Sequence, residues 1–259
     1  MTILKKINNK INQLNQNFNN YLNHKRLQKS HRIYAKNERS KPTKRTDIIN
    51  FLLSLNKKET KYLEIGVRDR KSNFDRVLSE IKYSVDPAVN LPNHKNHFKI
   101  TSDTFFKNLS SGKILQKDIR FDVIFIDGLH LAEQVEKDIS NALKFIKSDG
   151  FIVLHDCNPP SEWHARENYS YYSSPAREIW NGTVWKAFLK KRFDKKLQTC
   201  CIDTDWGIGI LSKNVPIGEA IPKNNHFYEF ESFKKNKKIN LNLMSFKEFR
   251  KLFIENDYL

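Results

Sequence analysis

The stretch that decides the fold is Phe121–Asp156, FDVIFIDGLHLAEQVEKDISNALKFIKSDGFIVLHD. It contains two short apolar runs, Val123–Ile126 and Phe151–Leu154, and acidic or imidazole side chains follow each run at once. A short apolar run closed by polar residues is typical of a strand buried on both faces of a sheet. The stretch therefore predicts two buried strands with reactive side chains at their carboxyl ends.

The segment between the two runs has the spacing of a helix. Its apolar residues recur every three or four positions, at Leu131, Val135, Ile139, Leu143 and Ile146. The sequence Ser148–Gly150 is typical of a helix end. Because a strand–helix–strand crossover makes the two strands parallel, their carboxyl ends lie at the edge where open sheets bind ligands. We therefore predict a site formed by Asp127, His130, His155 and Asp156.

Length and charge limit the class of protein without naming a partner. A chain of 259 residues can form one large α/β domain with appendages. Its 46 Lys and Arg residues exceed its 29 Asp and Glu residues, which gives a net charge of +17. Such an excess suits nucleic acid, anionic lipid or an acidic substrate. We favour a solvated lysine-rich surface instead, because Asn, Lys and Ile are abundant throughout the chain.

The cysteines and the apolar segments indicate the compartment. Cys157, Cys200 and Cys201 form neither a disulfide framework nor the paired spacing of a zinc site, and a reducing compartment suits them. No apolar run approaches the ~20 residues that a membrane-spanning helix needs. The first ten residues lack the apolar core of a secretory signal. We expect a soluble, cytoplasmic protein without a transmembrane segment.

The first 30 residues predict an amphipathic helical arm. Its apolar stripe consists of Ile3, Ile7, Ile11, Leu14, Phe18 and Leu22. Packing of the stripe on the chain's own domain is the first interpretation, and pairing with a second subunit is the next. Lys5, Lys6 and Lys10 leave an anionic membrane surface open as a third. Residues 31–45 are basic and predict a linker, after which Thr46 or Asp47 is the expected N-cap of a helix through Leu55.

The first strand of the domain is expected at Lys61–Val67, KYLEIGV. Gly66 allows a tight turn there with room for a ligand to approach. No further glycine follows, so the phosphate-binding pattern of dinucleotide sites is absent, and a ligand without a pyrophosphate fits better. A helix is expected from Ser72 or Asn73 to Ile81.

Two further strands are expected to lead into carboxylates. The strand Tyr83–Asp86 puts Asp86 about twenty residues after Gly66, which is the spacing of a carboxylate that accepts hydrogen bonds from ribose hydroxyls. An Asp before Pro87 is also ordinary turn chemistry. The strand at Phe98–Ile100 is followed by Asp103, for which contact with an adenine amino group and capping of a helix over Thr104–Leu109 are equal alternatives.

The chain after Asp156 predicts a lid and the far side of the sheet. Residues 157–175 are polar and aromatic without a helical period, which is typical of a substrate loop. A helix is expected over Arg177–Phe193, with Trp180 on its apolar face. A short connection then predicts a hairpin and hence one antiparallel strand at the sheet edge. The remaining expected elements are strands Leu197–Ile202, Gly207–Leu211 and Phe227–Phe233 and a helix over Ser245–Ile254.

The order of strand ends, E-x-G, D, D-G-x-H and H-D before a hairpin, resembles that of class I S-adenosylmethionine-dependent methyltransferases. LEIGV, FIDGLH and VLHD more narrowly resemble the macrocin O-methyltransferase type, which methylates sugar hydroxyls. The similarity covers about residues 60–212. It implies a doubly wound, mostly parallel seven-stranded sheet with one antiparallel edge strand. The expected domains are an arm and linker (1–45), a methyltransferase domain (46–213) and a C-terminal extension packed on it (214–259).

The resemblance also implies roles for the residues at the strand ends. Glu64 and Gly66 would line the methionine and ribose part of S-adenosylmethionine, and Asp86 would bind the ribose hydroxyls. Asp127 would contact the cofactor and would bind a divalent metal together with the acidic pair that ends the later strand, and His130 would be the general base. Here that pair is His155–Asp156. Because magnesium prefers oxygen ligands, the histidine favours manganese or puts metal dependence in doubt.

Structural alternatives stand beside these expectations. Asp127 would cap the following helix and His130 would be an exposed first-turn residue if neither were catalytic. Asn158–Pro160 resembles a motif of methyltransferases that act on nucleic-acid amino groups, but Ser161 replaces the aromatic residue that would stack on a flipped base. A non-catalytic scaffold on the same fold is the other alternative. We expect a sugar or glycan acceptor, no nucleic acid, and a homo-oligomer formed through the N-terminal arm.

Overall fold

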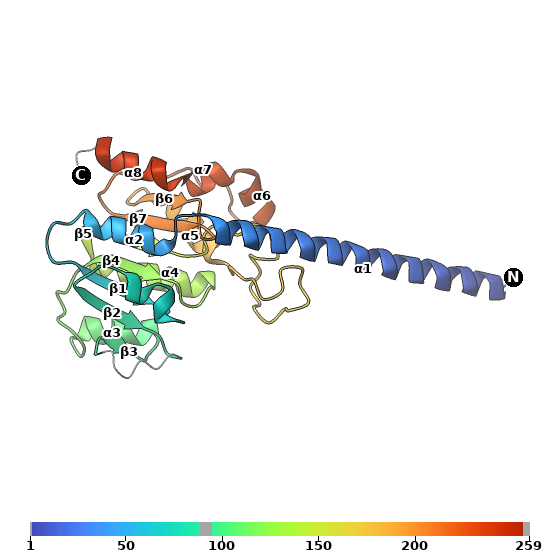
Figure 1. Ribbon diagram of the computed structural model, residues 1–259, viewed down its shortest axis with the longest axis horizontal. Helices are drawn as coiled ribbons and strands as arrows, with labels where there is room; N and C mark the ends of the chain where they lie inside the picture. The colour runs from blue at the N-terminus through green and yellow to red at the C-terminus, as the bar shows by residue number, and fades with distance from the viewer. Residues whose placement is uncertain (1, 89–94, 256–259) are drawn as a thin grey trace.

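The computed structural model describes residues 2–88 and 95–255. It consists of an α/β body and one long helix, α1 (Thr2–Ser40), whose N-terminal part projects far from the body (Figure 1). After four residues the chain enters α2 (Arg45–Ser54) and with it the body. The arm and the body are therefore joined by a short segment.

One mixed sheet forms the centre of the body, with the strand order β3-β2-β1-β4-β5-β7-β6-β8 in the described part of the chain. The strands from β3 to β5 in this order are parallel, so their carboxyl ends share one edge. β7 runs antiparallel to both β5 and β6. The bounds are β1 Lys61–Ile65, β2 Ile81–Val85, β3 His97–Phe98, β4 Phe121–Ile126, β5 Ile146–Leu154, β6 Gln198–Ile202, β7 Ile208–Ser212 and β8 Leu243–Met244.

This is the predicted mostly parallel α/β fold, with a difference at one side of the sheet. The hairpin is confirmed, but its second strand, β7, joins β5, and β6 lies outside it. The C-terminal extension then adds an eighth strand, β8, parallel to β6. The antiparallel strand therefore lies inside the sheet rather than at its edge, a choice that a short turn alone does not determine.

Helices cover both faces of the sheet. Helices α3 to α7 pack on one face, and α2 and α8 pack on the other. The strands supply both cores by alternation: Ile124 and Ile126 of β4 face the first core, and Val123 and Phe125 face the second. This explains the continuous apolar runs of the sequence. The remaining helix bounds are α3 Ser102–Ser111, α4 Ala132–Phe145, α5 Val184–Arg192, α6 Phe230–Lys235, α7 Lys237–Leu241 and α8 Phe246–Glu255.

The helix predicted after the first strand is wrong. The chain forms two 3₁₀ turns there, η1 (Arg70–Ser72) and η2 (Phe74–Arg76), and β2 begins at Ile81. Between the turns Asn73 has a non-helical backbone, with φ −145° and ψ −62°. Its side chain is buried and donates to Glu64. A contact with the end of β1 therefore breaks the helix that the sequence pattern favours.

The strand predicted at Phe227–Phe233 is also wrong. Residues 230–235 form helix α6, and the Asn225 side chain accepts a hydrogen bond from the Glu229 N–H group just before it. The helical spacing brings Phe230 and Phe233 together against Trp185 of α5. Tertiary packing therefore decides between two conformations that a short aromatic segment allows. The closing helix is confirmed as α8.

The arm differs from the prediction in two respects. Residues 31–40 continue α1, so only residues 41–44 remain of the predicted linker. His31 and Ala35 are buried on the body, whereas the stripe from Ile7 to Leu22, which we call the arm stripe, is exposed along the projecting part (Figure 1). Packing of these residues on their own domain is therefore wrong; the side chain of Ile3 lies outside the described residues.

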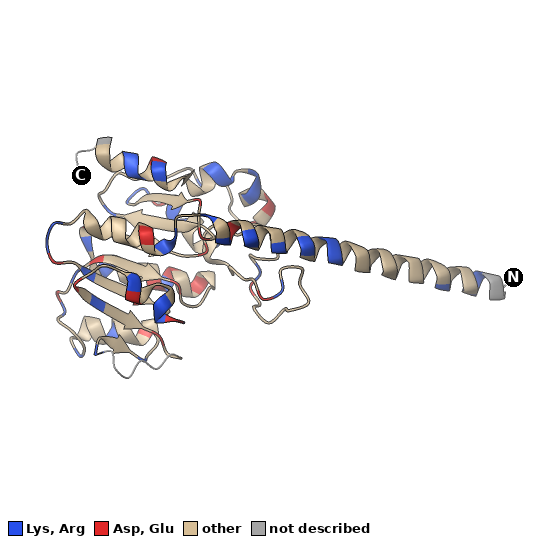
Figure 2. Cartoon of the chain, viewed as in Figure 1, with Lys and Arg blue, Asp and Glu red and all other residues tan. Residues whose placement is uncertain are grey.

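The charge distribution and the cysteines say little about how the helices and strands are arranged. Lys and Arg residues lie on α8 and on both ends of α1, and α1 has an uncharged stretch between them (Figure 2). The three cysteines are buried and free, as expected. In the described part of the chain, no helix combines the length and the apolar character that spanning a bilayer requires.

Candidate active site

A cavity of about 800 Å³ lies beyond the carboxyl ends of the parallel strands. The strand ends converge there because all of β3, β2, β1, β4 and β5 run in the same direction. Every residue that the sequence predicted for the site lines this cavity. These residues are Glu64, Gly66, Asp86, Asp103, Asp127, His130, His155 and Asp156.

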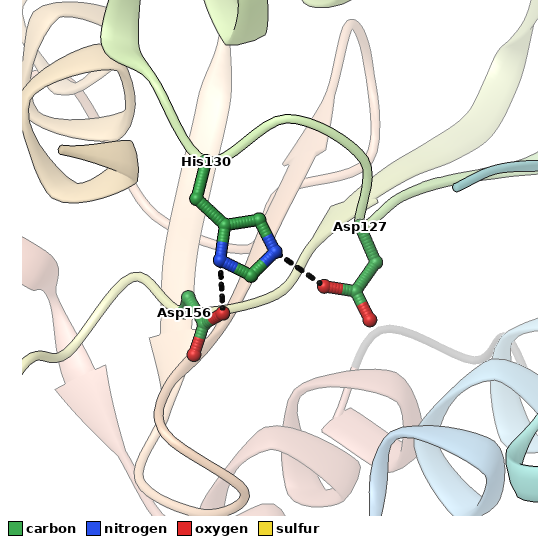
Figure 3. Close-up of side chains that lie close together, drawn as sticks. All are labelled: Asp127, His130 and Asp156. Carbon is green, nitrogen blue, oxygen red and sulfur yellow. Dashed lines mark ion pairs between the residues drawn. The ribbon is translucent and has the colours of Figure 1, made fainter. Parts of the chain in front are cut away.

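His130 lies between two carboxylates (Figure 3). Its Nε2 is 3.3 Å from Asp127 Oδ1, and its Nδ1 is 3.1 Å from Asp156 Oδ2. Helix α4 begins at Ala132 after Leu131, so Asp127 is not its cap, and only 21% of the His130 side chain is exposed. Both structural alternatives, capping by Asp127 and exposure of His130, are therefore wrong.

His155 faces the same two carboxylates from the buried side. Its Nδ1 lies 3.3 Å from Asp127 Oδ1 and 3.1 Å from Asp156 Oδ2. Its Nε2 lies 3.5 Å from Asp205 Oδ1. Neither ring nitrogen makes a well-directed hydrogen bond within the described part of the chain. Two imidazole rings thus surround the same pair of carboxylate oxygens.

Sequence reasoning missed two charged residues of this corner. Arg45, at the start of α2, has its Nη1 2.6 Å from Asp127 Oδ2 and its Nε 2.9 Å from Asp205 Oδ2. Asp205 lies in the turn between β6 and β7. Only its place in the strand connection could have pointed to it, and Arg45 carries no local signal at all.

These contacts shift the pKa values of the three central groups in opposite directions. Burial alone raises the pKa of Asp127, but the charges of His155 and Arg45 outweigh it and hold that pKa well below its ordinary value. Burial lowers the pKa of His130, but the Asp156 and Asp127 carboxylates outweigh it and raise that pKa. The same two carboxylates raise the pKa of His155 well above its ordinary value against its burial.

The segment before α5 closes the site. Trp180 stacks on His130 with ring centroids 5.2 Å apart and planes 16° apart, and Asn181 donates to Asp156 Oδ1. The Thr183 hydroxyl accepts a hydrogen bond from Ala132 N. The helix predicted from Arg177 therefore begins only at Val184, and Trp180 borders the cavity instead of lying on a helical core face.

The backbone conformation and the close neighbours of residue 66 require a glycine at this position. Its φ of +87° favours glycine, and a Cβ atom there would lie 2.3 Å from Asp127 O. The end of β1 thus packs directly against the backbone of Asp127, and this contact holds Asp127 at the cavity rim. The expected tight turn is confirmed, with the β4 end as the close neighbour.

The carboxylates at the β1 and β2 ends are held by groups of the protein. Glu64 accepts hydrogen bonds from Tyr62 (2.6 Å) and Asn73 (2.9 Å). Its burial, partly offset by these two bonds, raises its pKa to about 7. Asp86 accepts from the backbone amides of Val67 and Ala88, so the predicted turn chemistry is present while the side chain also lines the cavity.

Asp103 does not cap a helix. The cap of α3 is Thr101, whose hydroxyl accepts from Thr104 N, and Asp103 lies in the first turn. Its Oδ1 accepts from Gln134 Nε2 at 3.2 Å. Asp103 borders the cavity on the side of Asp86, so of its two predicted roles only the ligand contact remains as a prediction.

Comparisons with known proteins agree with this geometry. Residues 41–157 match a family model described as a methyltransferase domain. No curated protein matches the chain. The chain is similar to the Bacillus cereus O-methyltransferase solved with SAH, at 16% identity and TM-score 0.45 over 73% of this chain and 90% of that one.

Two further solved structures are similar to the chain. The SAH-bound Podospora anserina methyltransferase PaMTH1 is 12% identical, with TM-score 0.46 over 72% of this chain and 87% of that one. The methyltransferase MycE of the mycinamycin biosynthetic pathway, solved with Mg, SAH and mycinamycin VI, is 16% identical, with TM-score 0.39. Our chain covers 52% of MycE, and 71% of our chain is covered. The family match covers α2 and the strands β1 to β5, so this part of the α/β body is a methyltransferase domain.

Proposed function

We propose that this chain is an S-adenosylmethionine-dependent O-methyltransferase that methylates a hydroxyl of a sugar or glycan. The observation that supports it best is His130, held between Asp127 and Asp156 at the rim of a cavity of about 800 Å³. An imidazole in this position can accept the proton of a hydroxyl that lies in the cavity. The match to a methyltransferase domain supports the same chemistry.

The nucleoside end of the cofactor would occupy the side of the cavity formed by β1, β2 and the start of α3. Asp86 would accept hydrogen bonds from the ribose hydroxyls. Glu64 and Gly66 would border the methionine part, and Asp103 would meet the adenine amino group. No phosphate-binding glycine loop follows Gly66, which suits a nucleoside without a pyrophosphate.

The chain's own residues would orient and deprotonate the acceptor. When bound, S-adenosylmethionine supplies an activated methyl group and a thioether leaving group. His130 would take the hydroxyl proton as the oxygen bonds to the methyl carbon. Asp156 and Asp127 would stabilise the resulting imidazolium, because each has a carboxylate oxygen within 3.3 Å of a ring nitrogen.

A divalent ion fits the same corner. Asp127 Oδ2 is taken by Arg45 and Asp156 Oδ1 by Asn181, so the open ligand atoms are Asp127 Oδ1 and Asp156 Oδ2. The buried Nδ1 of His155 lies within 3.3 Å of both and lacks a hydrogen bond. We propose these three as the ligands, with manganese favoured over magnesium by the nitrogen donor. The two ring nitrogens of His130 lie equally close to these oxygens, Nε2 to Asp127 Oδ1 and Nδ1 to Asp156 Oδ2. Asp127, His130 and Asp156 are therefore also near enough to one another to hold an ion.

When bound, the ion would polarise the acceptor hydroxyl. Calorimetric titration of the full chain with Mn²⁺ checks the site without any turnover. Asp156→Asn should weaken binding at least tenfold, whereas His130→Ala should leave it within about threefold. The opposite pattern would make His130 the ligand and would count against its role as the base.

The acceptor side carries aromatic rings. Tyr169 and Trp180 border the cavity, and their ring centroids lie 5.3 Å apart. Glu178 adds a carboxylate beside them. Aromatic faces with nearby hydrogen-bond acceptors suit the apolar C–H face and the hydroxyls of a sugar ring. This combination supports a sugar acceptor over a purely apolar substrate.

Two measurements test the proposal. Calorimetry should show binding of S-adenosylhomocysteine to the full chain, and no binding would favour a non-catalytic scaffold. A panel of methyl glycosides and single-stranded and duplex oligonucleotides should then be assayed for release of S-adenosylhomocysteine. Turnover with a glycoside supports the proposal. Turnover with oligonucleotides alone, with steeply salt-dependent binding, would make the enzyme a nucleic-acid methyltransferase.

We also propose that the enzyme is a homo-oligomer joined through α1. Five exposed apolar residues follow alternating steps of four and three, the spacing of a coiled-coil seam. They are Ile7, Ile11, Leu14, Phe18 and Tyr21, each between 48% and 61% exposed. Residues 11–23 carry no Lys or Arg, which favours a second copy over an anionic membrane.

Helix propensity supports the same conclusion. Half of residues 8–23 are Asn, a poor helix former, and a helix of this composition needs packing to persist in water. Each buried apolar side chain contributes roughly 1.5–3 kcal/mol. Because only about half of each of these side chains is exposed, pairing would add roughly half of that amount per side chain. Ten of them in a pair would then contribute about 8–15 kcal/mol, comparable with the roughly 4–15 kcal/mol that association costs.

A further inference from the structure

Four charged side chains form a closed ring beside the cavity. Arg45 contacts Asp127 at 2.6 Å and Asp205 at 2.9 Å. His155 contacts the same two carboxylates, at 3.3 Å and 3.5 Å. Each basic side chain therefore touches both acidic ones, and each acidic side chain touches both basic ones. We call this set the charged ring.

The ring joins four separate segments of the fold. Asp127 follows β4, His155 follows β5, Arg45 begins α2, and Asp205 lies in the β6–β7 turn. Asp205 has a φ of +46°, in the left-handed region that non-glycine residues rarely adopt. Its side chain also accepts a hydrogen bond from Arg45 N at 3.1 Å. Such a backbone conformation persists only where the surroundings hold it, and here the ring and the α2 start hold it.

From this geometry we infer that Arg45 and Asp205 are positioning residues for methyl transfer. The inference rests on the proposed function. Arg45 occupies Asp127 Oδ2, so the other oxygen, Oδ1, is the one turned towards His130. Asp205 faces His155 Nε2, so Nδ1 is the nitrogen turned towards Asp127 and Asp156. Arg45 and Asp205 thus determine which oxygen of Asp127 and which ring nitrogen of His155 face the cavity.

A positioning role has a different signature from a stabilising one. Removal of either residue takes one of two counter-charges from each of its partners in a largely buried place, and we expect Asp127 then to turn or shift. The chemical step is sensitive to such displacements. The proposed cofactor contacts are Glu64, Gly66, Asp86 and Asp103. The ion pairs of Arg45 and Asp205 are instead with Asp127, with His155 and with each other. The variants should therefore lose turnover while retaining affinity for S-adenosylhomocysteine.

The test compares Arg45→Gln, Arg45→Lys, Asp205→Asn and the double variant Arg45→Gln/Asp205→Asn in the full chain. The matched control is Arg70→Gln, because Arg70 forms an exposed ion pair with Asp75 at 2.7 Å away from the ring. For each protein we would measure kcat with a methyl glycoside turned over by the wild type, affinity for S-adenosylhomocysteine, and unfolding in urea. Crystal structures with S-adenosylhomocysteine would locate Asp127.

We expect kcat to fall at least tenfold for Arg45→Gln and for Asp205→Asn, with product affinity changed less than threefold. The double variant should be no slower than the worse single variant, because both act through one ring, and Arg45→Lys should recover part of the loss. Multiplied losses, or a kcat within threefold of wild type while His130→Ala is inactive, would overturn the inference. If no glycoside is turned over, the proposed acceptor fails separately. The Arg45→Gln crystal structure then decides, and an unmoved Asp127 carboxylate would refute the positioning role.

Discussion

The charged ring and the arm stripe differ in whether their side chains find partners within the same chain. In the ring, Arg45, Asp127, His155 and Asp205 all have partners from the same molecule. Along the arm stripe, residues such as Leu14 and Phe18 are 61% exposed, and the N-terminal part of α1 projects from the body (Figure 1). The proposed chemistry therefore needs only one chain, whereas the proposed pairing of the arm needs a second copy. Changes in the ring should affect turnover and leave assembly intact, and changes in the arm should do the reverse.

The largest effect is expected for Asp127→Asn. The variant keeps the shape of the side chain but loses the charge that faces Arg45, His130 and His155. We expect kcat to fall by roughly 10²–10⁴, the range of a general acid–base contribution. Affinity for S-adenosylhomocysteine should stay within about threefold. Calorimetry and initial rates measure the two quantities, and activity equal to wild type would remove Asp127 from the mechanism.

His130→Ala should follow, with a loss of roughly 10² in kcat. The pKa of His130 is raised by Asp156 and Asp127, and only the neutral ring accepts a proton. The wild-type rate should therefore rise with pH through that raised pKa, and the alanine variant should lack this rise. His226→Ala, at an exposed position outside the cavity lining, is the control. A rise of the same size in His130→Ala would assign the base to another group.

Substitutions in the arm stripe should change the mass of the particle in solution rather than the rate of methyl transfer. Ile11→Lys/Leu14→Lys puts two charges into the proposed seam, and light scattering should then report half the mass of the wild-type particle if the oligomer is a dimer. Asn9→Lys/Gln16→Lys adds the same charges on the opposite side of the helix, about 200° away, and should leave the mass unchanged. A monomeric wild type, or equal effects of both pairs, would disprove pairing through this stripe.

Part of the site was predictable because it follows a rule of topology. Parallel strands end at one edge, so Asp127, His130, His155 and Asp156 could be expected together from their places after two apolar runs. Arg45 and Asp205 enter from outside the crossover unit, and Trp180 comes from a loop for which the sequence pattern predicts a helix. No local pattern encodes such contacts. The absence of a helix at residues 72–81 has the same cause, since the Asn73 side chain is engaged by Glu64.

The smallest expected effect concerns the place where the arm joins the body. The ring of His31 of α1 packs against the ring of His164, with centroids 4.9 Å apart and planes tilted by 34°, and His164 is fully buried. Burial, with the charges of His31, Arg166 and Lys237, lowers the pKa of His164 to about 3. The unfolded chain binds this proton near pH 6.5 and the folded chain does not, so stability is lost as pH falls below 6.5.

Between pH 6.5 and pH 5 the loss from this residue is about 2 kcal/mol, because each pH unit contributes about 1.4 kcal/mol in this window. His164→Gln should flatten the pH dependence of urea unfolding by about that amount, and His24→Gln, on the exposed part of α1 outside this junction, should not. The arm-stripe variants should leave the pH dependence of unfolding unchanged, because the contact between His31 and His164 is made within one chain. A slope that changed with them would mean that the junction is also completed by the second copy, and the contrast between the self-sufficient body and the dependent arm would then begin beyond residue 31.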